Sequence, residues 1–289
     1  MFDGFELREV ELGDVRVRYR SGGDGPPVVL LHGHPRTHTT WHAVAARLAG
    51  RHTVVCPDLR GYGGSTLPPT RPDHSQSSKR AMAGDVVALM RHLGHDRFAV
   101  VGHDRGALVA FRTALDHPDL VTGLVVMDGL PVVEHLERIN VTFARTWWHW
   151  WFLAQTEKPA EQVICADPEG WYRTPSPAEM GAGNHADVWQ ALRDPAVVHG
   201  MCEDYRAGLD IDREHEEADR AAGRTVACPT LLLEAVHDDI DVHGDPAAIW
   251  APWLSRPLRH RVVDSGHHQA EEAPEAVADE LLDFLTALG

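Results

Sequence analysis

One short run constrains the fold of this chain more than any other: Gly102-His103-Asp104-Arg105-Gly106. An apolar segment at residues 98–101 enters the run, and an Ala/Leu-rich segment at residues 107–115 leaves it. This pattern predicts a strand, a strained turn and a helix, because the glycines permit a turn that lifts the Asp104 side chain above a sheet. A carboxylate in that position attacks a saturated carbon bearing a leaving group and forms an alkyl ester, whereas a serine attacks an acyl carbon. The run therefore favours loss of a halide or opening of an epoxide over ester hydrolysis.

The charge balance argues against several classes of partner. The 289 residues contain 27 Lys and Arg against 43 Asp and Glu, which gives a formal net charge of −16. Such an acidic surface argues against nucleic acid and anionic membranes, and leaves a small molecule as the expected partner. No Cys-x-x-Cys pair, secretory signal or membrane-spanning apolar run is apparent. We therefore expect a cytoplasmic protein.

Apolar runs alternate with helical patterns through the first half of the chain. This repetition predicts an α/β fold with a mostly parallel central sheet and helices on both of its faces. A polar stretch at residues 68–78 is expected to form a surface loop. The expected strands are residues 15–19, 27–32, 52–56, 98–101 and 121–127, and the expected helices are residues 41–48, 81–93 and 107–115.

The alternation stops after residue 133. Residues 134–226 are rich in Trp, His and acidic residues, and they show helical patterns without a convincing strand. Strands are expected again at residues 230–235 and 258–263, followed by a helix at residues 274–288. We therefore expect a helical cap inserted into one α/β core. The expected domain boundaries are residues 1–133 for the first part of the core, 134–226 for the cap and 227–289 for the second part of the core.

Four local signals occur in the order that an α/β-hydrolase fold requires. His32-Gly33-His34-Pro35 follows an expected strand, and a backbone N–H near His34 could form one arm of an oxyanion hole. The Gly-rich run at residues 58–65 is typical of a turn that holds a loop against the core. The run around Asp104 comes third, and Ser265-Gly266-His267 follows the last strand, where a catalytic histidine belongs. The ordered set is much more specific than any one signal.

Two aspartates could serve as the acidic partner of His267. Asp128 directly follows the expected strand at residues 121–127, and Asp238 follows the expected strand at residues 230–235. Either loop can deliver a carboxylate to the histidine, because such a triad is defined by geometry rather than by position in the chain. We favour Asp128 and keep Asp238 as the alternative.

Three motifs resemble the haloacetate (fluoroacetate) dehalogenase family. They are residues 102–106, the run Trp148-His149-Trp150, and the run Asp204-Tyr205-Arg206-Ala207-Gly208. The resemblance extends over almost the whole chain. It implies that Asp104 is the nucleophile, Asp128 the acid and His267 the base.

The resemblance also implies how a substrate would be held. Arg105 would grip the substrate carboxylate, and His149, Trp150 and Tyr205 would donate hydrogen bonds to the departing halide. An imidazole N–H, an indole N–H and a phenol O–H are suitable donors, since none of them repels an anion. The family further implies a homodimer that needs no cofactor.

Two positions depart from the family pattern. Leu108 stands where a second arginine usually completes the clamp, and His34 stands where an aromatic residue is more frequent. Because residues three apart share a helix face, Leu108 should make the pocket apolar beside Arg105. Losing one charge-assisted hydrogen bond could cost about 1.5–3 kcal/mol of substrate binding. A bulkier 2-haloacid, or a substrate whose polar group binds more weakly than a carboxylate, therefore becomes a candidate in place of fluoroacetate.

The sequence supports one main functional hypothesis and two alternatives. The main hypothesis is a hydrolytic dehalogenase that acts on small 2-haloacids through an aspartyl alkyl ester. The first alternative is an epoxide hydrolase, for which Tyr172 and Tyr205 are the only tyrosines in the expected cap. The second alternative is a ligand-binding protein of the same fold without catalysis. The 20 histidines show no metal-ligand spacing, so no metal is expected.

Overall fold

An eight-stranded sheet forms the centre of the computed structural model, which describes residues 1–289. The strand order is β1-β2-β4-β3-β5-β6-β7-β8. Strand β2 pairs antiparallel with both β1 and β4, and all the other pairs are parallel. The strands are β1 Glu6–Leu12, β2 Val15–Gly22, β3 Pro27–Leu31, β4 Thr53–Pro57, β5 Phe98–His103, β6 Val121–Met127, β7 Thr230–Ala235 and β8 Arg259–Val263.

The central strands are apolar along their whole length because the sheet is buried on both faces. Successive side chains point to opposite faces, so Val28 and Leu30 on β3 pack into one hydrophobic cluster, and Val29 and Leu31 pack into the other. Both clusters continue across β5, β6 and β7. This double burial holds the carboxyl ends of the central strands in a fixed row.

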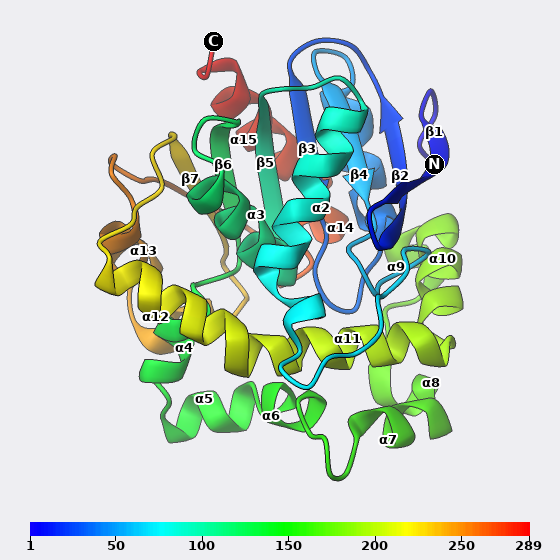
Figure 1. Ribbon diagram of the computed structural model, residues 1–289. Coiled ribbons are helices and arrows are strands. Elements are labelled where there is room, and N and C mark those ends of the chain that lie inside the picture. Colours follow the sequence, from blue (N-terminus) through cyan, green and yellow to red (C-terminus); the bar gives the residue numbers. More distant parts are fainter.

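Helices cover both faces of the sheet, which confirms the predicted fold class. Helices α2 and α3 pack against one face, and α1 and α15 pack together on the other (Figure 1). The core helices are α1 His42–Leu48, α2 Lys79–His92, α3 Arg105–Asp116, α13 Pro246–Trp250, α14 Gln269–Glu272 and α15 Pro274–Thr286. Short helical turns are η1 His38–Trp41, η2 Ser75–Ser77, η3 Gly208–Asp212, η4 Ile240–His243 and η5 Ala251–Trp253.

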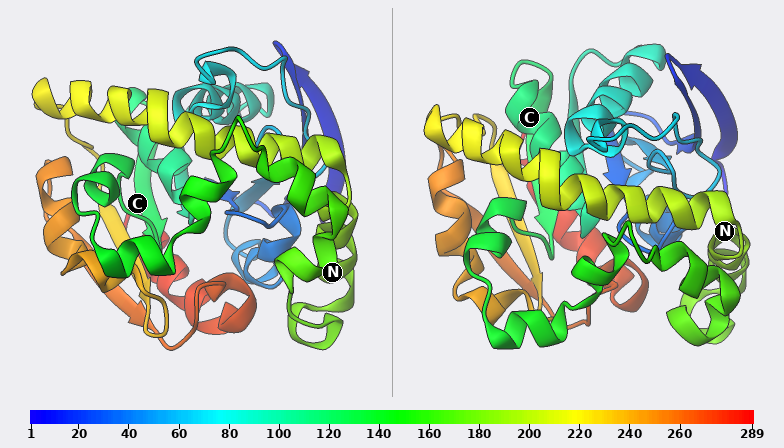
Figure 2. Two further views of the ribbon diagram at one scale, coloured as in Figure 1. Left: turned by 90° about the horizontal axis from the view of Figure 1, so that it is seen from below. Right: turned by 60° about the horizontal axis from the view of Figure 1, so that its bottom comes forward.

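Helices α4 to α12 separate β6 from β7 and lie together at one end of the sheet (Figure 1). Helix α11, the turn η3 and helix α12 follow one another in a long rod across this segment (Figure 2). The helical segment begins at Val132, two residues before the expected boundary at residue 134. Its helices are α4 Val132–Glu137, α5 Val141–Thr146, α6 His149–Leu153, α7 Ala160–Ala166, α8 Pro168–Tyr172, α9 Pro177–Met180, α10 Ala182–Leu192, α11 Pro195–Ala207 and α12 Arg213–Ala221.

Two expectations from the sequence were wrong or incomplete. Strand β1 was missed, because its side chains are mostly exposed and it lies at the sheet edge without an apolar alternation. The stretch at residues 68–78 is not wholly a surface loop, since Gln76 and Ser77 are buried. The Gln76 amide donates to Glu203 on α11 at 2.6 Å, so this stretch connects the core to the cap segment. None of the helices has the length and apolar character needed to cross a membrane.

Candidate active site

The turn between β5 and α3 holds Asp104 in a strained backbone conformation. The φ angle of Asp104 is +51°, which a residue with a side chain rarely adopts. A Cβ atom on Gly102 would lie 2.1 Å from the Gly106 carbonyl oxygen, so no larger residue fits there. A Cβ atom on Gly33 would lie 2.5 Å from Asp104 Oδ1. Both glycines therefore leave space for a pre-positioned carboxylate, whose side chain is 12% exposed.

The two oxygens of Asp104 have different surroundings. Oδ1 accepts a hydrogen bond from the His34 backbone N–H at 2.6 Å, as the sequence predicts for the oxyanion side. Oδ2 lies 4.0 Å from Nε2 of His267. Burial alone would raise the pKa of Asp104, but the positive charge of His267 brings it below its ordinary value. The carboxylate is thus ionised, with one oxygen fixed and the other free to react.

The acidic partner of His267 is Asp238, so the sequence preference for Asp128 was wrong. Nδ1 of His267 lies 2.9 Å from Asp238 Oδ2. Burial would lower the pKa of His267, but the hydrogen bond to Asp238 and the charges of Asp238 and Asp104 raise it to about 9. The imidazole is therefore positively charged at neutral pH while both carboxylates are ionised.

Asp128 lies beneath this pair and has other partners. Its Oδ1 accepts from the Ala235 backbone N–H at 2.9 Å, and its Oδ2 accepts from the Gln269 amide at 2.5 Å. Burial and the charge of Asp238 raise the pKa of Asp128 to about 7. Asp128 was a reasonable candidate from the sequence, because it does follow β6, but both of its oxygens already accept hydrogen bonds elsewhere.

The cap segment supplies hydrogen-bond donors to the cavity that Asp104 lines. His149 begins α6 and Tyr205 lies on α11, with their rings edge to face and their centroids 6.0 Å apart. Both side chains line the cavity, and neither donates to a protein acceptor. Trp150 packs against Tyr205 at a centroid distance of 6.1 Å and does not line the cavity. Trp147 does line it, although its indole N–H is taken by Asp239 at 3.0 Å.

Arg105 lies under Tyr205 rather than in the cavity wall. Its guanidinium donates to Asp204 through Nε at 3.0 Å and through Nη2 at 2.9 Å, and only Nη1 has no partner. Its Cζ atom lies 4.3 Å from the Tyr205 ring centroid. Leu108, one turn further along α3, is buried in the core and does not line the cavity either. Neither Arg105 nor Leu108, the two residues predicted to shape the carboxylate end of the pocket, is therefore among the residues that line this cavity.

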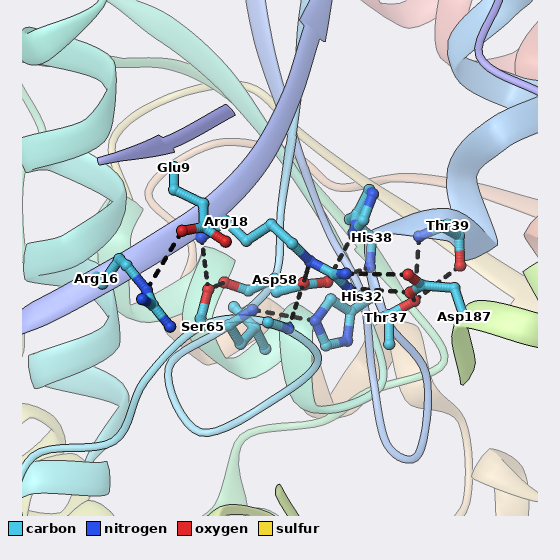
Figure 3. Close-up of polar contacts among 12 residues, drawn as sticks. Glu9, Arg16, Arg18, His32, Thr37, His38, Thr39, Asp58, Ser65 and Asp187 are labelled. Carbon is cyan, nitrogen blue, oxygen red and sulfur yellow. Dashed lines mark hydrogen bonds and ion pairs between the residues drawn. The ribbon is translucent and has the colours of Figure 1, made fainter. Parts of the chain in front are cut away.

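A buried polar network fixes the loop that carries the His34 N–H (Figure 3). Asp58 accepts from the His38 backbone N–H at 2.7 Å and from Arg18 Nε at 2.5 Å. The two terminal nitrogens of Arg18 each lie 3.0 Å from an oxygen of Asp187, which belongs to α10 of the cap segment. The network thus joins the first core strands, the oxyanion loop and the cap. The roles of Arg18 and Asp187 could not be predicted from the sequence, because nothing local indicates that residues so far apart in the chain meet.

The cavity above Asp104 encloses about 260 Å³, which suits a small molecule. It is bounded by His34, Pro35, Asp104, Thr146, Trp147, His149, Tyr205, Asp238, Asp239, His267 and His268. A larger groove of about 570 Å³ runs beside the Gly-rich run and α11, and it contains none of these residues. The chemistry therefore belongs to the smaller cavity.

One group of side chains has the spacing of metal ligands. Potential ligand atoms of His103, Asp128 and His267 all lie within 4.8 Å of one another. His267 and Asp128 already have hydrogen-bond partners in Asp238 and Gln269. These contacts fit an acid–base group better than a set of free ligands.

Comparison with known proteins shows which fold and which relatives the chain resembles. The sequence profile of the alpha/beta hydrolase fold matches residues 26–274. A fluoroacetate dehalogenase from Burkholderia sp is 42% identical over 99% of this chain and 95% of its own length. A soluble epoxide hydrolase from Corynebacterium sp. (strain C12) is 32% identical over 94% of both chains. Among solved structures, a Nostoc sp PCC 7120 protein classed with the alpha/beta hydrolases superposes with a TM-score of 0.95 at 39% identity, over 99% of both chains.

Proposed function

Because this chain belongs to the α/β-hydrolase fold family and is similar to fluoroacetate dehalogenase, we propose that it is a hydrolytic dehalogenase. It would remove halide from a small carbon compound through an alkyl ester of Asp104, and 2-haloacids are the substrate class that the resemblance implies. One observation carries the proposal. Asp104 Oδ1 is held by the His34 N–H, while Oδ2 faces the cavity 4.0 Å from His267.

In the first step, Oδ2 of Asp104 attacks the carbon that carries the halogen. The new C–O bond forms as the carbon–halogen bond breaks, and the halide leaves with the bonding electron pair. The His149 ring and the Tyr205 side chain line the same cavity as Asp104 and can donate hydrogen bonds to the halide. Aimed donors of this kind replace the water that a small anion such as fluoride would otherwise require.

In the second step, water cleaves the ester. His267 takes a proton from the water, whose oxygen attacks the Asp104 carboxyl carbon, and the His34 N–H stabilises the resulting oxyanion. The oxyanion then collapses, and the bond between the carboxyl carbon and the ester oxygen breaks. The departing alkoxide takes the proton from His267 and leaves as the alcohol, and the restored Asp104 carboxyl group releases its proton to solvent. Esterification removes the negative charge of Asp104, which is one of the causes that raise the pKa of His267. The imidazole therefore loses its proton more easily in the intermediate than in the free protein, which suits a base that acts only in this step.

Epoxide opening is the second candidate, and one observation favours it. The Tyr205 hydroxyl and the His149 ring are unpaired donors in the cavity that Asp104 also lines, where they could protonate the oxygen of an opening epoxide. The relative from Corynebacterium is an epoxide hydrolase. Release of halide or formation of a diol distinguishes the two reactions directly.

The proposal is tested by trapping the ester. A His267→Asn variant should complete the first step and stall, because water is no longer activated. Mass spectrometry should then show an increase equal to the substrate's alkyl group, located on the peptide that contains Asp104. An Asp104→Asn variant should show no such increase. A folded His267→Asn protein that gains no mass from a compound dehalogenated by the wild type would contradict the two-step scheme.

A further inference from the structure

The cavity wall is acidic and contains neither arginine nor lysine. Asp104, Asp238 and Asp239 all line it. His34 and His149 also line the cavity but do not offset the negative charge of these aspartates. Burial lowers the pKa of His34 to about 3 and that of His149 to about 4. Both rings are therefore neutral at neutral pH.

The positive charges near the cavity are already balanced by carboxylates. His267 lies between Asp238 and Asp104, as described above. Arg105 is 1% exposed, and its partner Asp204 is also bound by Lys79 and by the Tyr62 hydroxyl. The one unpaired nitrogen of Arg105, Nη1, has no contact with solvent. A carboxylate in the cavity would therefore find no free cation to pair with.

The cavity does offer a neutral polar partner for a substrate. His34 lines the cavity, its ring makes no hydrogen bond to another protein group, and it stands edge to face with Tyr205 at a centroid distance of 5.2 Å. A neutral imidazole donates one hydrogen bond and accepts another. This capacity matches the carbonyl oxygen or the NH₂ group of an amide.

We propose that the preferred substrate is an uncharged 2-halogenated carbonyl compound, such as a 2-haloamide, rather than a 2-haloacid. This inference rests on the proposed dehalogenase function and changes only the charge of the substrate. An acid would bring a negative charge close to Asp104 and Asp239, where like charges repel and no cation offsets them. An amide has nearly the same size and shape, keeps the α-halogen and avoids that repulsion.

The test compares bromide release from 2-bromopropionamide and 2-bromopropionate by the full-length protein. The Asp104→Asn variant supplies the background from alkylation of the exposed thiol of Cys165. The amide should have a kcat/KM at least about tenfold higher, which corresponds to about 1.4 kcal/mol. Equal or faster release from the acid would overturn the inference and leave the dehalogenase function intact. Release from neither compound would overturn the inference together with the halide chemistry on which it rests.

An isosteric variant tests the electrostatic cause. Asp239→Asn removes one negative charge from the cavity wall and keeps an oxygen that can accept the Trp147 indole N–H. It should lower KM for the acid by about threefold or more, and change KM for the amide little. Asp24→Asn, an equal charge change on an exposed loop before β3, should alter neither value. An Asp239→Asn variant with an unchanged acid-to-amide ratio would contradict the charge argument.

Discussion

Nδ1 of His267 lies 2.9 Å from Asp238, whereas the oxygens of Asp128, directly below, accept from Ala235 and Gln269. Two carboxylates that follow adjacent strands thus lie near His267, and their different hydrogen-bond partners give them different roles. Asp238 orients the imidazole and stabilises its charge. Asp128 holds the last residue of β7, Ala235, three positions before Asp238, and it holds Gln269, two positions after His267.

The two acids should therefore respond differently to substitution. Asp238→Asn should slow turnover by about 10²-fold or more, since the imidazole loses the carboxylate that orients it and stabilises its charge. Asp128→Asn should slow turnover by less than about tenfold, because the Ala235 N–H keeps an acceptor. Steady-state kinetics on the two folded variants gives the comparison. A larger loss of turnover for Asp128→Asn than for Asp238→Asn would show that Asp128, not Asp238, orients His267.

Removing the Tyr205 hydroxyl should affect fluoride more than bromide. Tyr205→Phe keeps the ring over Arg105 and deletes one donor facing the leaving group. Loss of a well-aimed donor can cost about 10²-fold in rate, and a small, strongly solvated anion depends on it most. Release of fluoride and bromide from matched substrates provides the measurement.

Tyr172→Phe is the control for this change, since the Tyr172 hydroxyl lies 3.9 Å from the Met201 sulfur atom. The control should leave the ratio of fluoride to bromide release unchanged. The same ratio in Tyr205→Phe as in the wild type would exclude the hydroxyl as a halide donor.

The fold was predictable from the sequence where local pattern and burial agree. The apolar runs of β3, β5, β6 and β7 are buried on both faces, so each reads as a strand by itself. Strand β1 has no such pattern, because its place in the sheet depends on pairing with β2 rather than on burial.

From the sequence, the site could be predicted only as far as the strands and loops that supply its side chains. The glycines around Asp104 and the strand before His267 indicate where each side chain leaves the sheet. The choice between Asp128 and Asp238 depends on a few ångströms of loop geometry, which neither loop sequence encodes locally. The pairing of Arg105 with Asp204 likewise could not be predicted from the sequence, because the two residues are 99 positions apart.

A buried glutamate should make stability depend on pH. Glu216 on α12 is 2% exposed, accepts from the Val133 backbone N–H at 2.9 Å, and has its pKa raised to about 8 by burial. A pKa raised from 4.5 on folding stabilises the protein fully below about pH 4.5, and this contribution is lost as the pH rises through about 8. The loss amounts to at most about 1.4 kcal/mol per pH unit.

Glu216→Gln keeps the acceptor for Val133 and removes the titration. Its free energy of unfolding, measured with denaturant from about pH 5 to about pH 9, should fall less steeply than that of the wild type. Glu214→Gln, an exposed neighbour on the same helix, should follow the wild-type curve. Parallel curves for Glu216→Gln and the wild type would contradict the buried-carboxyl argument.

The most direct test of covalent catalysis by Asp104 is a single turnover in water enriched in oxygen-18, with protein in excess over substrate. The account predicts that the first hydroxy product carries ordinary oxygen from the protein, and that the heavy isotope appears in the peptide containing Asp104. Heavy oxygen in the first product, with none in that peptide, would mean that water attacks the substrate directly and would contradict the account.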